Sequence, residues 1–389
     1  MPSSLPAPSD AALAHCRLVE SRLRDEIAAA GGWLPFDRFM ELALYAPGLG
    51  YYSAGLHKFG GSGDFVTAPE ISALFGQTLA RQAAQVLELT GGDILEIGAG
   101  SGRLALDLLR ELATIGRLPE RYLILDVSAD LRERQRRLLE TQLPQLASRV
   151  VWLDALPETF SGLILGNEAL DAMPVHMLAW RGGEIFERGV EWRDAAFCWG
   201  ERPLTQGQLY QCTSQLPPAR DTHGEAYISE VALAAGGFVA TLAERLEHGM
   251  MLFIDYGFGE SEYYHPQRSQ GTLMCHYRHH AHDDPLCLTG LQDITAHVDF
   301  TAIAQQGISH GLHLLGYTTQ ANFLLNCGLI DILGRISPDD TGAYLPLAAQ
   351  AQKLVSPAEM GELFKVLALG KGIDLPLLGF ARGDKSYLL

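Results

Sequence analysis

The chain has 389 residues, 47% of them apolar, and a formal charge of −17 at pH 7. This size predicts one large domain with additions, or two domains, and the negative charge argues against nucleic-acid binding, which depends on lysine and arginine contacts to phosphate. No apolar run approaches the roughly 20 residues that cross a membrane, no signal peptide is recognisable, and the cysteines form no C-x-x-C pair. We therefore expect a protein that stays inside the cell, with reduced thiols and no membrane insertion.

The first part of the chain is predicted to be helical. Residues 13–30 and 36–44 carry apolar side chains at helical spacing. A glycine-rich loop over residues 60–68 then precedes a third helix, from about residue 70 to residue 89. We expect residues 1–60 to form an N-terminal helical region.

From Asp93 onward, short apolar segments alternate with longer helical stretches, which is the pattern of βαβ units in a parallel sheet. The predicted strands are residues 94–97, 122–127, 150–153, 163–166 and 250–255. We therefore predict an α/β fold with a Rossmann-like, doubly wound sheet, formed by residues 61–174 and 230–389.

Residues 175–229 interrupt this pattern. Their short alternating segments, separated by turn residues, predict an inserted antiparallel β meander that could contact a substrate or partner. Beyond the fifth strand we expect a polar loop over residues 257–297, a strand at 313–318, a helical tail and a last short strand near 377–381.

The first strand runs into a glycine-rich turn that contains Gly98, Gly100 and Gly102. Glycines let a backbone approach a ligand and adopt positive φ. A dinucleotide-binding turn would have another glycine at position 103, where this chain has Arg103. The G-x-G-x-G pattern, with Glu96 two residues before it, instead resembles motif I of class I methyltransferases, which bind S-adenosylmethionine.

Two acidic residues follow the next two strands in order. Asp126 ends the second strand, where a carboxylate can accept both ribose hydroxyls of an adenosine. Asp154 follows the third strand, where it can accept a hydrogen bond from the adenine amino group. Either residue alone could equally cap the next helix. Together with the glycine turn, they predict an S-adenosylmethionine site.

Thr67, Pro69 and Glu70 lie upstream, at the end of the glycine-rich loop. This segment resembles the loop that many methyltransferases place over the methionine end of the cofactor. The same residues could also simply begin a helix, since proline suits a first helical turn.

Asn167, Glu168 and Asp171 follow the fourth strand, whose carboxyl end should lie beside the cofactor crevice. Glu168 and Asp171 could hold a planar guanidinium through paired hydrogen bonds. Alternatively, Asn167 caps a helix and the acids favour its positive end. We expect Asp255 and His297 to support the site or accept a proton, although His297 could equally be a packed, hydrogen-bonded histidine.

A run rich in histidine, Cys275 to Asp284, raises the question of a metal site. Its spacing does not match that of paired metal ligands, and polar loops rich in histidine are common. We therefore predict no metal ion.

Taken in order, the motifs resemble the MidA family, class I arginine methyltransferases linked to the assembly of respiratory complex I. The resemblance runs from about residue 33 to the C-terminus and includes Tyr45, Gly50-Tyr51-Tyr52, Gly63-Asp64-Phe65, Asn167-Glu168, Asp255-Tyr256-Gly257 and Asp293 to Phe300. It implies symmetric dimethylation of an arginine on the large quinone-side subunit of complex I. It also implies a bacterial cytoplasmic protein, or a mitochondrial matrix protein in a eukaryote. The chain departs from the family at Asp126, where glutamate is more usual.

Two other functions stay open. A methyltransferase for a small molecule or nucleobase is disfavoured by the acidic charge and by the lack of an Asn-Pro-Pro-aromatic segment after the fourth strand. A non-catalytic assembly factor that binds S-adenosylmethionine is disfavoured by the acids on the acceptor side.

Overall fold

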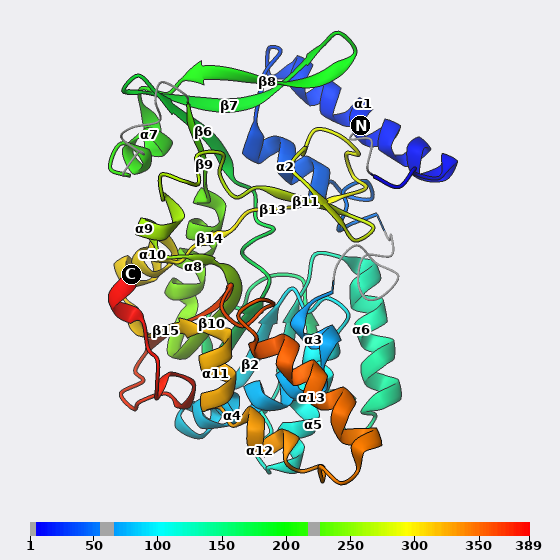
Figure 1. Cartoon of the computed structure of the whole chain (residues 1–389), viewed down its shortest axis with the longest axis vertical. Helices are drawn as coiled ribbons and strands as arrows, with labels where there is room; N and C mark the ends of the chain where they lie inside the picture. The colour runs from blue at the N-terminus through cyan, green and yellow to red at the C-terminus, as the bar shows by residue number, and fades with distance from the viewer. Residues whose placement is uncertain (1–4, 55–65, 217–225) are drawn as a thin grey trace. The chain divides into compact units, whose positions relative to one another are not determined.

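The structure is a computed structural model that describes residues 5–54, 66–216 and 226–389 (Figure 1). The chain divides into two compact units. Unit 1 consists of Met1–Phe65, Asp171–Gly237 and Phe258–Asp299, and unit 2 of Val66–Leu170, Phe238–Gly257 and Phe300–Leu389. Residues 258–299 were predicted to belong to the Rossmann-like domain, but their contacts place them in unit 1. The glycine-rich loop lies outside the described residues as far as residue 65.

Unit 2 is built on a sheet with the strand order β15-β16-β10-β5-β2-β3-β4. From β10 to β4 neighbouring strands are parallel, whereas β16 is antiparallel to both β10 and β15. The strands are β2 (Asp93–Ile97), β3 (Tyr122–Leu125), β4 (Val150–Leu153), β5 (Phe160–Asn167), β10 (Leu246–Phe258), β15 (His313–Thr319) and β16 (Phe364–Lys371). The chain passes to one side of β2 and then returns to the other, so the order reverses between β2 and β5 and the sheet is doubly wound.

The predicted parallel strands and the strand at 313–318 are confirmed, but two predictions near the C-terminus are wrong. The last strand of the sheet is β16, in a region predicted to be helical. The strand predicted near 377–381 is a 3-10 helix, Leu378–Phe380. Its backbone N–H groups have side-chain partners instead of a neighbouring strand, because Leu378 N donates to Gln85 Oε1 and Gly379 N to Gln82 Oε1, both at 2.9 Å.

Helices cover the sheet of unit 2. They are α3 (Ala68–Ile71), α4 (Ala73–Thr90), α5 (Arg103–Thr114), α6 (Ala129–Gln142), α10 (Phe300–Ser309), α11 (Gln320–Asn326), α12 (Leu329–Leu333) and α13 (Thr341–Val355), with α8 (Leu233–Arg245) entering from unit 1. Serine side chains cap α4 and α6, and Gly91 ends α4 in the left-handed conformation. The core joins Phe75 of α4, Leu108 of α5 and Leu163 of β5. Burying each such side chain contributes roughly 1.5–3 kcal/mol.

Unit 1 contains two antiparallel sheets. The larger one confirms the predicted meander, whereas the smaller one lies within residues 257–297, which were predicted to be a polar loop. The larger has the order β1-β7-β6-β9, with β8 paired to β7, and the smaller has the order β12-β11-β13. The strands are β1 (Leu34–Pro35), β6 (His176–Arg181), β7 (Glu184–Arg193), β8 (Ala196–Pro203), β9 (Tyr227–Val231), β11 (Met274–Tyr277), β12 (His280–His282) and β13 (Asp293–Thr295). Helices α1 (Asp10–Ala29) and α2 (Phe36–Tyr45) contribute Leu23 and Phe39 to a core shared with Val190 of β7.

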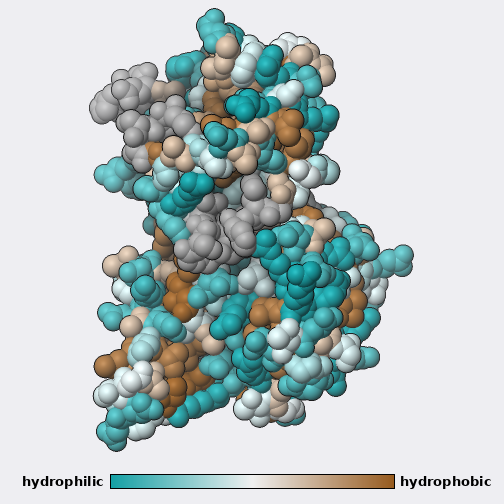
Figure 2. All heavy atoms as spheres, turned by 90° about the vertical axis from the view of Figure 1, so that its right-hand side faces the viewer, coloured by the Kyte–Doolittle hydropathy of each residue, from teal (hydrophilic) through white to brown (hydrophobic). Residues whose placement is uncertain are grey.

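The surface carries apolar side chains despite the strong net charge. Leu325, Ile330 and Leu345 are exposed on the last helices of unit 2, and Figure 2 shows apolar atoms gathered in the lower part of one face. Within the described ranges, no helix is long and apolar enough to cross a membrane.

Candidate functional site

The candidate site lies where the strand order of unit 2 reverses. Ile97, the last residue of β2, pairs with Gly166 of β5, and Asn167 pairs with Ile254 of β10. The three strands are parallel, so their carboxyl ends meet at one edge of the sheet. Ligands bind at this point in doubly wound sheets.

The glycine turn begins directly after β2. Gly98, Gly100 and Gly102 have φ values of 66°, 53° and 83°, which residues with a side chain rarely adopt. A Cβ atom on Gly98 would meet no heavy atom within 4 Å, so the space beside this residue is open for a ligand. The turn therefore combines a backbone conformation that glycine adopts readily with open space beside Gly98, as close contact with a cofactor requires.

The predicted upstream residues also lie beside this turn. Pro69 is buried, and Glu70, in α3, accepts a hydrogen bond from the Ser101 hydroxyl. Thr67 precedes α3, but its side chain makes no capping hydrogen bond. The structure thus brings α3 to the glycine turn through Glu70, and the contact of these residues with the methionine end of a cofactor stays a prediction.

Glu96 is a buried acid within β2, with 2% of its surface exposed. One carboxylate oxygen accepts a hydrogen bond from the Tyr122 hydroxyl at 2.7 Å. Burial, together with the negative charge of Asp126, raises the pKa of Glu96 to about 7, although the bond from Tyr122 opposes this shift. Glu96 can therefore gain or lose a proton near neutral pH.

The two acids assigned to the adenosine half have different surroundings. Asp126 is buried, and its Oδ1 accepts a hydrogen bond from Ser128 N at 2.9 Å. The Asp154 side chain is 89% exposed and forms an ion pair with Arg132 at 2.7 Å. Asp126 is thus buried at the end of β3, whereas Asp154 is exposed after β4 and keeps a second carboxylate oxygen besides the one that faces Arg132.

Asn167 and Glu168 form a turn with unusual local geometry. Glu168 has φ 50°, in the left-handed region that glutamate rarely adopts. Asn167 Nδ2 donates to Glu168 Oε1 at 3.2 Å, while Asn167 Oδ1 is buried and accepts no hydrogen bond from any described residue. A buried acceptor without a donor is costly. The edge of the sheet is therefore ready to accept an N–H group from a ligand.

Asp255 holds this turn in place. Its Oδ2 accepts hydrogen bonds from the backbone N–H groups of Ala169 and Leu170, at 3.2 and 3.0 Å, and its Oδ1 accepts one from Tyr256 N at 3.0 Å. The side chain is 1% exposed. Asp255 is thus a positioning residue for the turn, one of the two roles that the sequence predicted.

Asp171 belongs to unit 1, because the boundary between the units falls after Leu170. It is buried, and its carbonyl accepts a hydrogen bond from Ala296 N at 2.9 Å. The charge of Asp171 also acts on Tyr52, whose hydroxyl donates to Asp293 at 2.8 Å. Burial and the charge of Asp293 raise the pKa of Tyr52 well above its ordinary value, so this tyrosine stays protonated.

His297 also belongs to unit 1. Its ring stacks on Phe258, with 5.3 Å between ring centres and 7° between the planes. Its backbone N–H donates to Thr272 Oγ1 at 3.0 Å. The roles of His297 and Asp171 toward an acceptor stay predictions.

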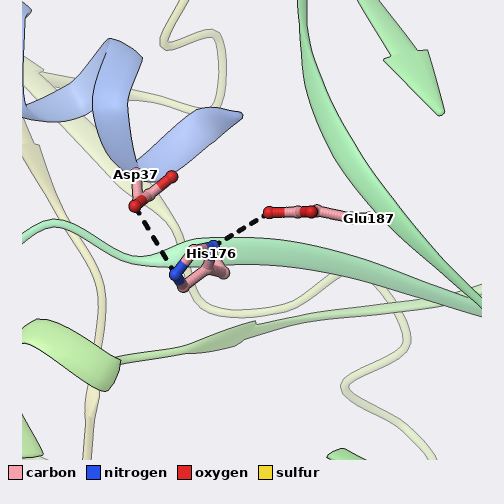
Figure 3. Close-up of side chains that lie close together, drawn as sticks. All are labelled: Asp37, His176 and Glu187. Atoms are coloured by element: carbon pink, nitrogen blue, oxygen red, sulfur yellow. Dashed lines mark hydrogen bonds and ion pairs between the residues drawn. The ribbon is translucent and has the colours of Figure 1, made fainter. Parts of the chain in front are cut away.

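Of the described residues, a single group of acids, histidines or cysteines lies close enough to share a metal ion: Asp37, His176 and Glu187 in unit 1. Figure 3 shows the imidazole between the two carboxylates. His176 Nε2 lies 3.5 Å from Asp37, and Nδ1 lies 3.0 Å from Glu187. One ligand atom from each residue lies within 4.8 Å of the others, but the two acids face opposite nitrogens of the ring. The geometry fits a histidine bridging two carboxylates.

Three polar residues of the site escaped the sequence analysis: Tyr122, Gln135 and Trp152. Tyr122 binds Glu96, and Gln135 binds both Trp152 and Asp126. A signal for Gln135 is present in the sequence, because it lies four residues from both Leu131 and Leu139, on the buried face of an otherwise charged helix.

The chain is similar to several known proteins. A family model described as "Putative S-adenosyl-L-methionine-dependent methyltransferase" matches residues 78–318. The "Protein arginine methyltransferase NDUFAF7 homolog, mitochondrial" of Drosophila melanogaster is 29% identical, over 96% of this chain and 91% of the relative. The mouse "Protein arginine methyltransferase NDUFAF7, mitochondrial" is 30% identical, over 87% and 81%.

A solved structure covers almost the whole chain. It is a "likely methyl transferase" from Burkholderia thailandensis bound to S-adenosyl-homocysteine. It is 52% identical, with a TM-score of 0.95, and the match covers 99% of this chain and 100% of the other. The aligned region therefore includes the glycine turn, the Asn167 turn and Asp255.

Proposed function

Because the chain belongs to a family of S-adenosyl-L-methionine-dependent methyltransferases, we propose that its glycine turn binds this cofactor and that the enzyme methylates an arginine side chain of a protein. The family resemblance, the class I α/β fold and the methyl donor predicted from the sequence are confirmed. The residues of the site and the identity of the acceptor are our proposal.

The observation that carries the proposal is the meeting of two features at one edge of the sheet. The glycine turn leaves open space beside Gly98, and the adjacent Asn167 Oδ1 is a buried acceptor with no donor among the described residues. The open space beside Gly98 suits the close approach of a cofactor, and Asn167 Oδ1 suits an N–H group of the substrate that receives the methyl group. The glycine turn therefore fits the methyl donor.

We assign the cofactor residues as the sequence predicts. Gly98, Gly100 and Gly102 would face the cofactor, with Glu96 behind the turn and Thr67, Pro69 and Glu70 at the methionine end. Asp126 would accept the ribose hydroxyls, and Asp154 would contact adenine at the rim.

An arginine acceptor is supported by chemistry and by likeness. Asn167 Oδ1 and the Glu168 carboxylate are acceptors, and a guanidinium presents several N–H donors in one plane. The net charge of −17 favours encounter with a basic segment, and the relatives above are named protein arginine methyltransferases. By family resemblance, we propose the large quinone-side subunit of complex I as substrate, in a bacterial cytoplasm or a mitochondrial matrix.

Methyl transfer to an arginine depends mainly on the alignment of the acceptor nitrogen with the methyl group. When bound, S-adenosylmethionine supplies an electrophilic methyl group on a sulfonium sulfur, which is a good leaving group. The residues of the chain need to hold the acceptor nitrogen in line with that group and to exclude water. Asn167 and Glu168 can each accept a hydrogen bond from a guanidinium N–H group. These two bonds would direct the guanidinium nitrogen that receives the methyl group toward the glycine turn. The acceptor nitrogen releases one proton, for which His297 is our predicted acceptor.

The test is to incubate the purified full chain with methyl-labelled S-adenosylmethionine and a cell lysate, and to map the labelled residue. We expect label on an arginine of a protein, and replacing that arginine by lysine should stop labelling. Label on a lysine, a nucleic acid or a metabolite would overturn the substrate assignment. Cofactor binding without any labelling would favour the non-catalytic assembly factor.

A further inference from the structure

Gln135 connects three separate parts of the proposed adenosine site. It lies in α6 and is fully buried. Its Nε2 donates to the Gly100 carbonyl at 2.9 Å and to Asp126 Oδ2 at 2.8 Å. Its Oε1 accepts a hydrogen bond from Trp152 Nε1 at 2.9 Å. One side chain therefore joins the glycine turn, the acid after β3 and the tryptophan of β4.

These contacts determine which way the amide of Gln135 points. An indole N–H can only donate, so the amide oxygen must face Trp152. The two amide protons then face the Gly100 carbonyl and the Asp126 carboxylate, both of which can only accept. In the flipped orientation all three contacts would be lost, so Trp152, the Gly100 carbonyl and Asp126 together set the direction of the Gln135 amide.

Packing around Gln135 restricts it further. A Cβ atom on Gly102 would lie 3.1 Å from Gln135 Cγ, so the close approach of α6 requires glycine at this position. Trp152 is itself packed, since the guanidinium of Arg136 lies 4.8 Å from the centre of its ring. The amide therefore has little freedom to move away from Asp126.

We propose that Gln135 is a positioning residue for the methyl donor. It directs the Asp126 carboxylate toward the ribose and fixes the Gly100 carbonyl of the glycine turn. Trp152 contributes by holding the amide oxygen of Gln135. This inference rests on the proposed cofactor site, in which Asp126 accepts the ribose hydroxyls.

Two substitutions separate this role from simple packing. Gln135→Met keeps the length of the side chain but removes both donors. Gln135→Glu keeps the shape but places a carboxylate against Asp126, and it can donate again once it is protonated. Gln142→Glu, an exposed position at the end of the same helix, is the matched control.

The measurement is the affinity of the full-length chain for S-adenosyl-homocysteine, by calorimetry between pH 6 and pH 8.5. Affinities are compared with the wild-type value at each pH, because Glu96, with a pKa of about 7, titrates in the same range. At pH 8 we expect Gln135→Glu and Gln135→Met to lose roughly 10- to 100-fold, the range for losing a hydrogen bond to a charged group.

The pH dependence then distinguishes the two variants. As pH falls, Gln135→Glu should regain affinity and Gln135→Met should not, while Gln142→Glu should bind like the wild type throughout. In turnover assays the KM for the cofactor should rise far more than kcat falls. Affinity within about twofold of wild type at pH 8, in folded Gln135 variants, would overturn the inference. If Asp126→Asn also bound normally, the proposed cofactor site itself would fail.

Discussion

We expect the buried acid Glu96 to make the stability of the cofactor-free protein fall as pH rises through neutrality. Its carboxyl is 2% exposed and has one hydrogen-bond donor, the Tyr122 hydroxyl. Burial and the charge of Asp126 move its pKa from 4.5 to about 7. Between these two values the folded protein holds a proton that the unfolded chain releases.

The sign and size of the effect follow from this difference. The folded state binds more protons than the unfolded state, so the free energy of unfolding decreases with increasing pH. The contribution is complete below pH 4.5 and is lost as pH passes about 7. A difference of about 2.5 in pKa corresponds to about 3 kcal/mol. Glu96→Gln removes this titration, and its amide oxygen can still accept the bond from Tyr122.

The assay is urea unfolding at several pH values between 5.5 and 8.5, without cofactor. Relative to wild type, Glu96→Gln should gain stability as pH rises, by about 2 kcal/mol between pH 5.5 and 8.5, because the first part of the titration lies below this range. Glu140→Gln, on the exposed side of α6, is the control and should follow the wild type. Tyr122→Phe should shift the titration to higher pH, because the bond from Tyr122 favours the charged form. Parallel stability curves for wild type and Glu96→Gln would refute the reasoning.

Three further predictions concern binding and turnover. Gly98→Val should abolish binding of S-adenosyl-homocysteine in calorimetry, whereas Gly116→Val, with a similar φ of 68° and equally open space, should strain the backbone without affecting affinity. Glu168→Gln and Asp171→Asn should each lower the methylation rate roughly 100-fold and leave cofactor affinity within a few-fold, the scale expected when positioning is lost; near-normal turnover would remove them from the acceptor site. Asp255→Asn should also reduce turnover more than cofactor affinity, because an amide cannot accept all three backbone hydrogen bonds as well as a carboxylate. An unchanged rate would contradict the positioning role of Asp255.

Much of the fold could be predicted because the parallel strands are short apolar runs separated by helices. The antiparallel strand β16 escaped this pattern. Its sequence from Phe364 to Gly370 is buried on both faces and has no alternation of polar and apolar residues, so periodicity alone cannot distinguish it from a buried helix. The 3-10 helix at Leu378–Phe380 depends on the side chains of Gln82 and Gln85, almost 300 residues earlier, which no local pattern indicates.

The residues of the site, like the elements of the fold, could be predicted from the sequence only in part. The positions of Gly98, Asp126 and Asn167 follow from strand order, because Gly98 and Asp126 come directly after strands, Asn167 is the last residue of β5, and the parallel strands end at one edge. The sequence also predicted an acid at the end of the third strand, but not that Asp154 would be exposed and paired with Arg132. Side-chain partners of this kind depend on how α6 packs against β4, and strand order does not determine that packing.

The Asn167 turn shows why the supporting residues matter as much as those that face the ligand. Glu168 adopts φ 50°, which costs of order 1–3 kcal/mol and persists only where the surroundings hold it. The surroundings are two consecutive residues of β10: Ile254 O accepts a hydrogen bond from Glu168 N at 2.8 Å, and the Asp255 carboxylate accepts from the next two backbone N–H groups. The strained backbone of Glu168 is therefore held from β10, the strand that pairs with β5 at this edge. A backbone held this firmly fixes the direction in which the side chain leaves the chain, and Asn167 Nδ2 adds a hydrogen bond to the carboxylate. Such support favours the in-line alignment that methyl transfer to an acceptor nitrogen requires.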